Sequence, residues 1–266
     1  MELVARGGDC LVFRISDREV LKQPQEWPDE RDREDTRENF EREIEFFKSL
    51  QKYGKNPHHP HLVNCTDLTF TNGIRLEFLS GGNLETRLSE TSQIALTEKV
   101  RWLEGLSAAV NFITSIGFAH GDLRPANVLL DHSGNVKLCD FGATVKIGGE
   151  KYALHVPFWD GDSEVADHKS EQFALASCLF TIIVEAEPYA EIEETNRVNE
   201  TIDLFRKYKF PRTNGRLGLF HLFHPIISKS WHRKYESMTA MHGDILNACY
   251  TTRVNSDLGG KLEGSG

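Results

Sequence analysis

The spacing of hydrophobic and polar positions changes along the chain, from alternation in the first part to a helical repeat in the second. Leu11, Phe13 and Ile15 alternate with their neighbours, which predicts a strand because successive side chains point to opposite faces. After a turn, residues 19–23 are expected to return as the partner strand. Further strands are predicted over 62–68 and 74–79, around an Asn-Gly hairpin turn at 72–73.

One long charged helix interrupts these strands. Pro28 and Asp29 suit a helix start, because proline is tolerated in the first turn and an acidic side chain favours the positive helix end. Hydrophobic residues then recur at helical spacing and predict the buried stripe of this helix, which consists of Phe40, Ile44, Phe47 and Leu50.

The rest of the chain is predicted to be mainly helical. One helix starts at Thr97 and ends at Gly117, and two short strands follow at 128–130 and 136–139. Further helices are expected over 169–185, 198–208, 220–230 and 235–250. The pattern predicts an α+β fold with two lobes: a β-rich N-lobe over 1–76, a link over 77–82, a larger α-rich C-lobe over 83–254 and a flexible, glycine-rich tail over 255–266.

The charge balance and the cysteines narrow the class of protein. Lys and Arg number 31 and Asp and Glu 40, a net charge of −9, and a negative domain repels nucleic acid and anionic lipid. The five cysteines are scattered without a C-x-x-C pair, which favours a reducing compartment. No stretch reaches the roughly 20 apolar residues of a membrane span, and the start shows no signal peptide. We therefore expect a cytoplasmic protein whose partners are neither nucleic acids nor membranes.

The strongest chemical signal consists of two polar motifs on either side of the short strands. They are HGDLRPAN at 120–127 and DFG at 140–142. Phosphoryl transfer needs an acceptor for the proton of the substrate hydroxyl, which Asp122 can supply. It also needs oxygen ligands for Mg²⁺, which Asn127 and Asp140 can supply. Either motif alone is equally well explained as a polar turn, but the two at this spacing favour the catalytic interpretation.

These motifs, extended to HGDLRPANVLL and KLCDFG, resemble the catalytic loop and the metal-binding motif of the eukaryotic protein kinase family. The resemblance covers nearly the whole chain and implies a single two-lobed protein-kinase-like domain over 1–254 that uses ATP and Mg²⁺. By position, it makes Asp122 the catalytic base and makes Asn127 and Asp140 the Mg²⁺ ligands.

The resemblance also assigns two basic residues. Arg124 stands where the family has a lysine near the γ-phosphate, and Lys22 matches the strand lysine that binds the α- and β-phosphates. A partner for Lys22 follows from the residues themselves, because Glu43 lies on the helix face that carries the hydrophobic stripe. A carboxylate turned towards the core needs a cation. We therefore predict a Lys22–Glu43 ion pair, with Glu41 or Glu45 as the alternative.

The phosphate-binding loop is the weakest part of the resemblance. Gly7 and Gly8 stand where the family has three spaced glycines, and an ordinary tight turn is the competing explanation. The resemblance further implies a nucleotide pocket formed by Val12, Val20, Leu76, Glu77, Leu79 and Leu130.

One departure from the family concerns regulation. Gly121 replaces an arginine of the catalytic loop that, in the family, helps to bind a phosphate on the following segment. That segment offers Thr144 and Tyr152 as the phosphate acceptors before Trp159. Because a glycine supplies no side chain, we predict that catalysis does not depend on phosphorylation of this segment.

Two further departures concern the end of that segment. No A-P-E motif closes it, and Asp160 or Glu164 is the possible replacement for its glutamate. Glu171 stands where the family carries an aspartate that braces the catalytic loop.

Three functions remain open on these observations. The first is an ATP- and Mg²⁺-dependent protein kinase that phosphorylates a Ser or Thr hydroxyl of a protein. The H-G-D sequence and the short hairpin before Lys22 also resemble small-molecule kinases of the aminoglycoside and choline type. The missing glycines and the altered segment favour a third alternative, a pseudokinase that serves as an interaction module. The oligomeric state stays undetermined.

Overall fold

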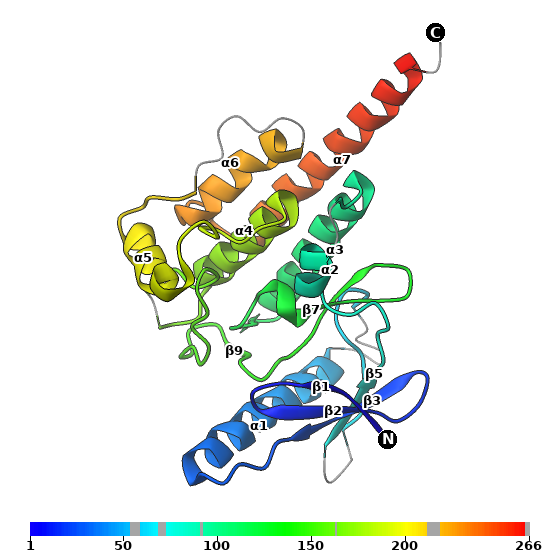
Figure 1. Cartoon of the computed structure of the whole chain (residues 1–266), viewed down its shortest axis with the longest axis vertical. Helices are drawn as coiled ribbons and strands as arrows, with labels where there is room; N and C mark the ends of the chain where they lie inside the picture. The colour runs from blue at the N-terminus through cyan, green and yellow to red at the C-terminus, as the bar shows by residue number, and fades with distance from the viewer. Residues whose placement is uncertain (54–58, 69–72, 91–92, 163, 212–218, 264–266) are drawn as a thin grey trace.

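The structure, a computed structural model, describes residues 1–53, 59–68, 73–90, 93–162, 164–211 and 219–263, with the backbone alone over 257–263. Figure 1 shows a small lobe built from a sheet and one helix, and above it a larger lobe of packed helices. The predicted α+β, two-lobed fold is confirmed. None of the helices in the described part of the chain is both long and apolar enough to cross a membrane.

The small lobe contains an antiparallel sheet of five strands in the order β1-β2-β3-β5-β4. Val12 of β2 pairs with Lys22 of β3, and Val20 of β3 pairs with Leu76 of β5. Paired residues, and residues two apart on one strand, share a face of the sheet, so these four side chains lie on one face. The strands are β1 (Glu2–Arg6), β2 (Cys10–Arg14), β3 (Glu19–Pro24), β4 (Cys65–Asp67) and β5 (Ile74–Glu77).

Two of these strands differ from the prediction. Strand β1 has no hydrophobic alternation to reveal it because all of its residues are exposed. The strand predicted over 62–68 is shorter, because its first residues contact the other lobe instead: the Val63 amide donates to the Leu138 carbonyl at 2.9 Å. Asn72 of the predicted hairpin turn lies outside the described residues.

Helix α1 (Glu30–Lys52) begins where the sequence predicts, with the Asp29 carboxylate accepting from the Arg31 amide at 2.9 Å. Its buried face is rotated relative to the predicted stripe. Phe40 and Ile44 are only half-buried, whereas the buried residues of the helix are Thr36, Glu43, Phe46, Phe47 and Leu50.

The rotation of α1 has a tertiary cause. Phe141, from the DFG motif of the large lobe, stacks on Phe46 with ring centroids 4.3 Å apart and meets Phe47 edge-on at 5.3 Å. Since aromatic contacts of this kind add to the energy of burial, they set the face that α1 turns towards the large lobe. Glu43 lies on that face and is buried with it.

The large lobe packs its helices around α4, which is buried almost all round from Ser170 to Ile182. Helix α3 contacts both α4 and α7. The helices are α2 (Leu84–Glu90), α3 (Leu96–Ser115), α4 (His168–Val184), α5 (Glu194–Arg206), α6 (Leu219–Trp231) and α7 (Met238–Glu263).

The C-terminal end of the chain differs from the prediction. Helix α7 continues to Glu263, beyond residue 250, where the sequence predicts the helix to end. Each residue added to an existing helix gains one backbone hydrogen bond. The glycines at 259–260 each disfavour the helix by only about 1 kcal/mol, so they do not end it. The flexibility expected for residues 255–266 stays a prediction.

Short strands position the polar motifs between the lobes. Strands β6 (Phe118–Ala119) and β9 (Val145–Lys146) pair with each other, as do β7 (Val128–Leu130) and β8 (Val136–Leu138). The residues between β6 and β7 include a 3₁₀ turn over Pro125–Asn127. This arrangement places HGDLRPAN and DFG next to each other, with the Cys139 amide donating to the Asn127 carbonyl at 2.9 Å and Phe141 packed against α1.

Candidate active site

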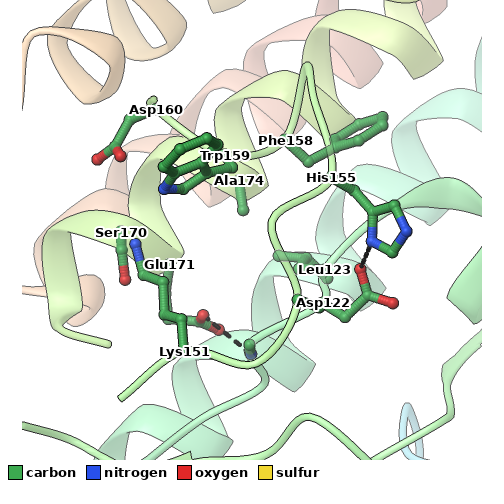
Figure 2. A pocket seen from close by; sticks show the side chains of 12 residues that line it. Asp122, Leu123, Lys151, His155, Phe158, Trp159, Asp160, Ser170, Glu171 and Ala174 are labelled. Atoms are coloured by element: carbon green, nitrogen blue, oxygen red, sulfur yellow. Dashed lines mark hydrogen bonds and ion pairs between the residues drawn. The ribbon is translucent and has the colours of Figure 1, made fainter. Parts of the chain in front are cut away.

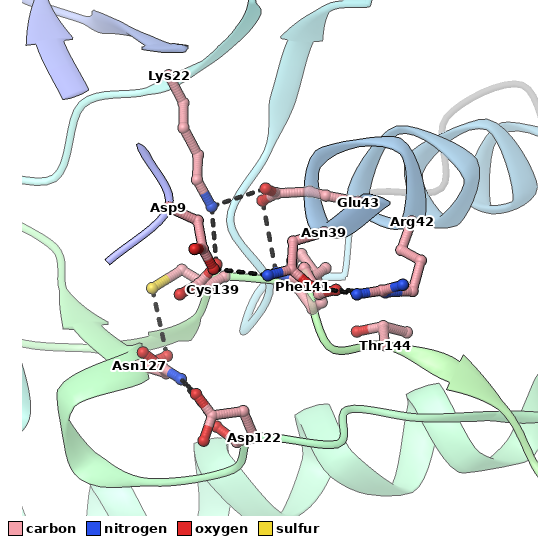
Figure 3. Close-up of polar contacts among 12 residues, drawn as sticks. Asp9, Lys22, Asn39, Arg42, Glu43, Asp122, Asn127, Cys139, Phe141 and Thr144 are labelled. Atoms are coloured by element: carbon pink, nitrogen blue, oxygen red, sulfur yellow. Dashed lines mark hydrogen bonds and ion pairs between the residues drawn. The ribbon is translucent and has the colours of Figure 1, made fainter. Parts of the chain in front are cut away.

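A buried cation joins the two lobes at the centre of the site. The ammonium nitrogen of Lys22 lies 2.6 Å from Glu43 Oε2 (Figure 3). It also lies 2.8 Å from Asp140 Oδ1. The predicted Lys22–Glu43 pair is therefore present, and neither Glu41 nor Glu45 is needed as the alternative. The same cation also holds the aspartate of the DFG motif, which connects strand β3, helix α1 and the large lobe at one point.

The two carboxylates around Lys22 have different electrostatic environments. Burial alone would lower the pKa of Lys22, but the charges of Asp140 and Glu43 outweigh it and raise this pKa well above its ordinary value. Burial raises the pKa of Glu43. The Lys22 ammonium instead lowers the pKa of Asp140, whose side chain is 45% exposed. Asp140 is thus the carboxylate better suited to remain ionised and to meet a cation from solvent.

The carboxylate of Asp122 is held from both sides. The Asn127 side-chain amide donates to Asp122 Oδ2 at 2.8 Å, and Arg124 Nε lies 3.3 Å from the same oxygen. The other oxygen, Oδ1, lies 2.7 Å from His155 Nδ1. Burial would raise the pKa of Asp122, but the hydrogen bond and charge of His155, together with the charge of Arg124, outweigh it and lower this pKa. Asp122 therefore remains a carboxylate able to accept a proton.

The backbone around Asp122 is fixed by Glu171 of α4. Its carboxylate accepts from the His120 amide at 2.9 Å and from the Gly121 amide at 3.2 Å, and Figure 2 shows it next to Lys151 and beside the loop. Burial raises the pKa of Glu171. On the other side, His120 Nε2 lies 3.0 Å from the Cys139 carbonyl, which ties the loop to the DFG motif. Glu171 thus occupies the bracing position that the sequence indicated.

The segment that ends at α4 is anchored by Asp160. This carboxylate is buried and forms an ion pair with Arg233, whereas Glu164 is exposed. Of the two acids that the sequence left open, Asp160 is therefore the one positioned to anchor this end of the segment.

A cavity of about 570 Å³ opens between the lobes and is lined by about half of the predicted site residues; Asn127 and the residues expected around the nucleotide base are not part of this lining. Its lining includes Lys22 and Asp140 on one side, Asp122 and Arg124 on the other, and the turn at Gly7 and Gly8. Figure 3 shows Lys22, Glu43 and Asp122 around this space. The turn is closed by a hydrogen bond from the Gly7 amide to the Cys10 carbonyl at 2.9 Å, so the tight turn considered for these glycines exists and lies at the cavity.

The residues expected around the base of a nucleotide form an apolar layer. Val20, Leu76 and Leu130 are buried, while Val12 and Leu79 are partly buried against the same core.

Two backbone amides of the link between the lobes are hydrogen-bonded within the protein. The Glu77 amide donates to the Asn64 carbonyl at 2.9 Å, and the Phe78 amide donates to the Arg18 carbonyl at 2.8 Å. The Glu77 side chain binds Lys137 at 2.6 Å. The amides of Glu77 and Phe78 therefore hold the link in place and are not free for a ligand.

The donor atoms of Asn127 and Asp140 suit a hard cation such as Mg²⁺. The Asn127 side-chain nitrogen donates to Asp122, which leaves the amide oxygen as the atom available to a metal ion. Asp140 uses Oδ1 for Lys22 and keeps its second carboxylate oxygen. Its φ of 63° is uncommon for a residue other than glycine and typical of functional sites. One neutral and one anionic oxygen ligand, with the remaining positions filled by phosphate and water, is usual for Mg²⁺.

The sequence model of the family described as "Protein kinase domain" matches residues 20–255. The chain therefore belongs to the protein kinase domain family, whose members are phosphotransferases. The match begins at Val20, so the turn at Gly7 and Gly8 precedes it, in agreement with the weak glycine pattern there.

Curated relatives include several protein kinases. CBL-interacting protein kinase 8 of Oryza sativa subsp. japonica is 29% identical over 199 residues, which is 69% of this chain and 42% of the relative. CBL-interacting serine/threonine-protein kinase 5 of Arabidopsis thaliana is 29% identical over 140 residues, 51% of this chain and 27% of the relative. Mitogen-activated protein kinase kinase kinase 3 of Homo sapiens is 27% identical over 167 residues, 58% of this chain and 26% of the relative. The aligned part thus spans less than half the length of each of these proteins.

Sequence reasoning missed further contacts of the site besides the Lys22–Asp140 pair. The first is the contact between His155 and Asp122. The sequence offered one sign of it, since His155 is the single histidine between the DFG motif and α4. The second joins the glycine turn to α1: Asn39 donates to the Asp9 carboxylate at 2.6 Å, and the Thr36 hydroxyl donates to it at 3.4 Å. No periodicity marks these pairs, because each joins segments far apart in the sequence.

Proposed function

We propose that this chain is an ATP- and Mg²⁺-dependent protein kinase that transfers the γ-phosphate of ATP to a Ser or Thr hydroxyl of a protein. One observation carries the proposal: Lys22 is paired with both Glu43 and Asp140 at a cavity that Asp122 also lines. A pseudokinase has no need to keep this complete set of charges. The Ser/Thr part of the proposal draws on the name of the Arabidopsis relative, and the proposal includes a cytoplasmic location for a chain whose five cysteines are free thiols.

The proposed reaction assigns a task to each of these side chains. The acceptor hydroxyl donates its proton to the carboxylate of Asp122 while its oxygen forms a bond to the γ-phosphorus. The bond from that phosphorus to the β,γ-bridging oxygen breaks, and ADP leaves with the bond electrons. Lys22 and Arg124 bind phosphate oxygens and offset the charge on them.

The metal-binding residues complete this assignment. Asn127 and Asp140 would hold Mg²⁺, which when bound neutralises charge on the phosphates. Asn127 also keeps the carboxylate of Asp122 in place through its side-chain nitrogen. One asparagine therefore serves both the base and the metal site.

Phosphoryl transfer to a panel of acceptors tests the proposal. The purified chain is incubated with γ-labelled ATP and Mg²⁺, in parallel with protein acceptors and with aminoglycosides and choline, and labelled residues are identified after acid hydrolysis. We expect phosphoserine or phosphothreonine that disappears in Asp122→Asn and persists in Asp17→Asn, a matched change at a side chain that is 97% exposed. Label on a small molecule alone, or no transfer to any acceptor, would contradict the proposal.

A further inference from the structure

The segment between β9 and α4 contacts helix α1 through an aromatic ring. The guanidinium carbon of Arg42 lies 3.7 Å from the centroid of the Tyr152 ring. Tyr152 is 52% exposed, whereas the Arg42 side chain is only 16% exposed. A cation over an aromatic face is attracted by the ring quadrupole, and more strongly where the cation is partly desolvated.

The hydrogen bonds of Arg42 hold its guanidinium in place. Its Nε donates to the Gly142 carbonyl of the DFG motif at 2.9 Å, one terminal nitrogen lies 3.4 Å from Glu38, and the other donates to Asn39 Oδ1. A guanidinium donates within its plane and stacks through its face. Arg42 can therefore fix the DFG backbone and bind Tyr152 at the same time.

The same group extends to the glycine turn. Asn39, which accepts from Arg42, donates in turn to the Asp9 carboxylate at 2.6 Å, as Figure 3 shows. Arg42 also directly precedes Glu43, the partner of Lys22, in the sequence. Through Arg42, the Tyr152 segment is thus connected to the DFG motif, to α1 and to the turn at the cavity.

The catalytic loop cannot supply a cation to this segment from position 121. Gly121 has a φ of 81°, and a Cβ atom there would overlap the carbonyl oxygen of Ala143. A side chain is therefore excluded by both the backbone conformation and the lack of space. Of the two acceptors in the segment, Thr144 is buried and its hydroxyl donates to the His120 carbonyl at 3.2 Å, which leaves Tyr152 as the exposed one.

We propose that Arg42 and Tyr152 form a clamp that orders the segment over 150–159 without any phosphate. In this role Tyr152 acts through the face of its unmodified ring, and Arg42 is a positioning residue that holds the segment and the Gly142 carbonyl together. The clamp keeps His155 next to Asp122 and so maintains the acceptor side of the cavity. Its effect on catalysis rests on the proposed kinase function, but its effect on the order of the segment does not.

Hydrogen exchange of the peptides covering 143–160 tests the clamp directly. We expect exchange to become about three- to tenfold faster in Tyr152→Ala and in Arg42→Gln, the range that a partly buried cation–π contact implies. Tyr152→Phe keeps the ring and should restore the parent rate. Arg37→Gln, a matched change at an exposed position of α1, should leave exchange unchanged.

The double variant and the kinetics complete the test. Arg42→Gln with Tyr152→Ala should exchange no faster than Arg42→Gln alone, because the contact is lost only once. With a protein acceptor, we expect Tyr152→Ala to raise the acceptor KM more than it lowers kcat, and Tyr152→Phe to reverse the effect.

Several results would overturn the clamp. These are parent-like exchange in Tyr152→Ala, additive effects in the double variant, equally fast exchange in the Phe and Ala variants, or faster exchange of the parent after phosphatase treatment. A parent protein that transfers no phosphate would contradict the kinase function alone, since the exchange measurement would still decide on the clamp.

Discussion

Removal of the buried cation is the most informative perturbation of this site. In Lys22→Met, Glu43, which is 1% exposed, loses the ammonium group 2.6 Å away. Asp140, the second carboxylate that bound this ammonium group, remains next to Glu43. Two acids that shared a lysine then face each other. The alternative change, Glu43→Gln, leaves Lys22 with Asp140 and with an amide that still accepts a hydrogen bond.

These differences determine the expected loss of stability. Removing one partner of a buried ion pair destabilises a protein by about 3–5 kcal/mol, which we expect for Lys22→Met. Glu43→Gln should cost about 1–3 kcal/mol, because Lys22 retains its second partner. That partner is half exposed, and the solvent screens its attraction, so Asp140 compensates only in part. The double variant should lose about 1–3 kcal/mol less than the sum of the two single losses.

The pH dependence of the loss identifies its cause. Without Lys22, burial raises the pKa of Glu43 in the folded state above its value in the unfolded chain, so that the folded state binds more protons between these two pKa values. Stability therefore falls as the pH rises through that window. The deficit of Lys22→Met relative to the parent should be smaller at about pH 5 than at about pH 8.

Chemical denaturation of the parent and the three variants measures these quantities, with phosphoryl transfer recorded in parallel. Lys48→Met, an exposed change on α1, is the matched control and should stay within about 0.5 kcal/mol of the parent. Additive losses, or a deficit of Lys22→Met that grows towards low pH, would refute the reasoning.

Three further predictions concern catalysis. Asp140→Asn removes the anionic metal ligand and should reduce Mg²⁺-dependent transfer at least about a hundredfold with little change in folding; equal turnover at matched Mg²⁺ would contradict the assignment. His155→Ala removes a group that lowers the pKa of Asp122, so this pKa should rise and the acid limb of the kcat/KM profile should move to higher pH; an unchanged limb would show that His155 does not act on the base. Tyr152→Phe and phosphatase-treated parent should both stay active, whereas a tenfold loss, about 1.4 kcal/mol in the barrier, would mean that phosphorylation of the segment is required.

Several features of the site could be predicted because the residues that carry them lie close together in the sequence. HGDLRPAN and DFG flank two short strands, and the strand pairing of β7 with β8 brings Asn127 and Asp140 near each other. The Lys22–Glu43 pair was predictable for a different reason, since a carboxylate on the buried side of a helix needs a cation. The helix start at Asp29 was likewise predictable from local chemistry.

Other features depended on contacts that no local pattern encodes. The sequence placed Phe40 and Ile44 in the buried stripe of α1, but Phe141 from the other lobe selected Phe46 instead. Strand β1 is exposed on both faces, so its existence follows from pairing with β2 and not from its own hydrophobic pattern.

By itself, the sequence determined the class of fold, the order of the main helices and of most strands of the small lobe, and the presence of the two motifs, because these depend on periodicity, caps and residues that are close along the chain. Tertiary structure alone decided which groups meet across the cavity: Lys22 with Asp140, His155 with Asp122, and Arg42 with Gly142 and Tyr152. The physical reason is the distance along the sequence between the residues that interact. Backbone geometry and burial act locally and leave a periodic trace, whereas a hydrogen bond or a ring contact between distant segments depends on ångström-scale placement that only the packed lobes provide.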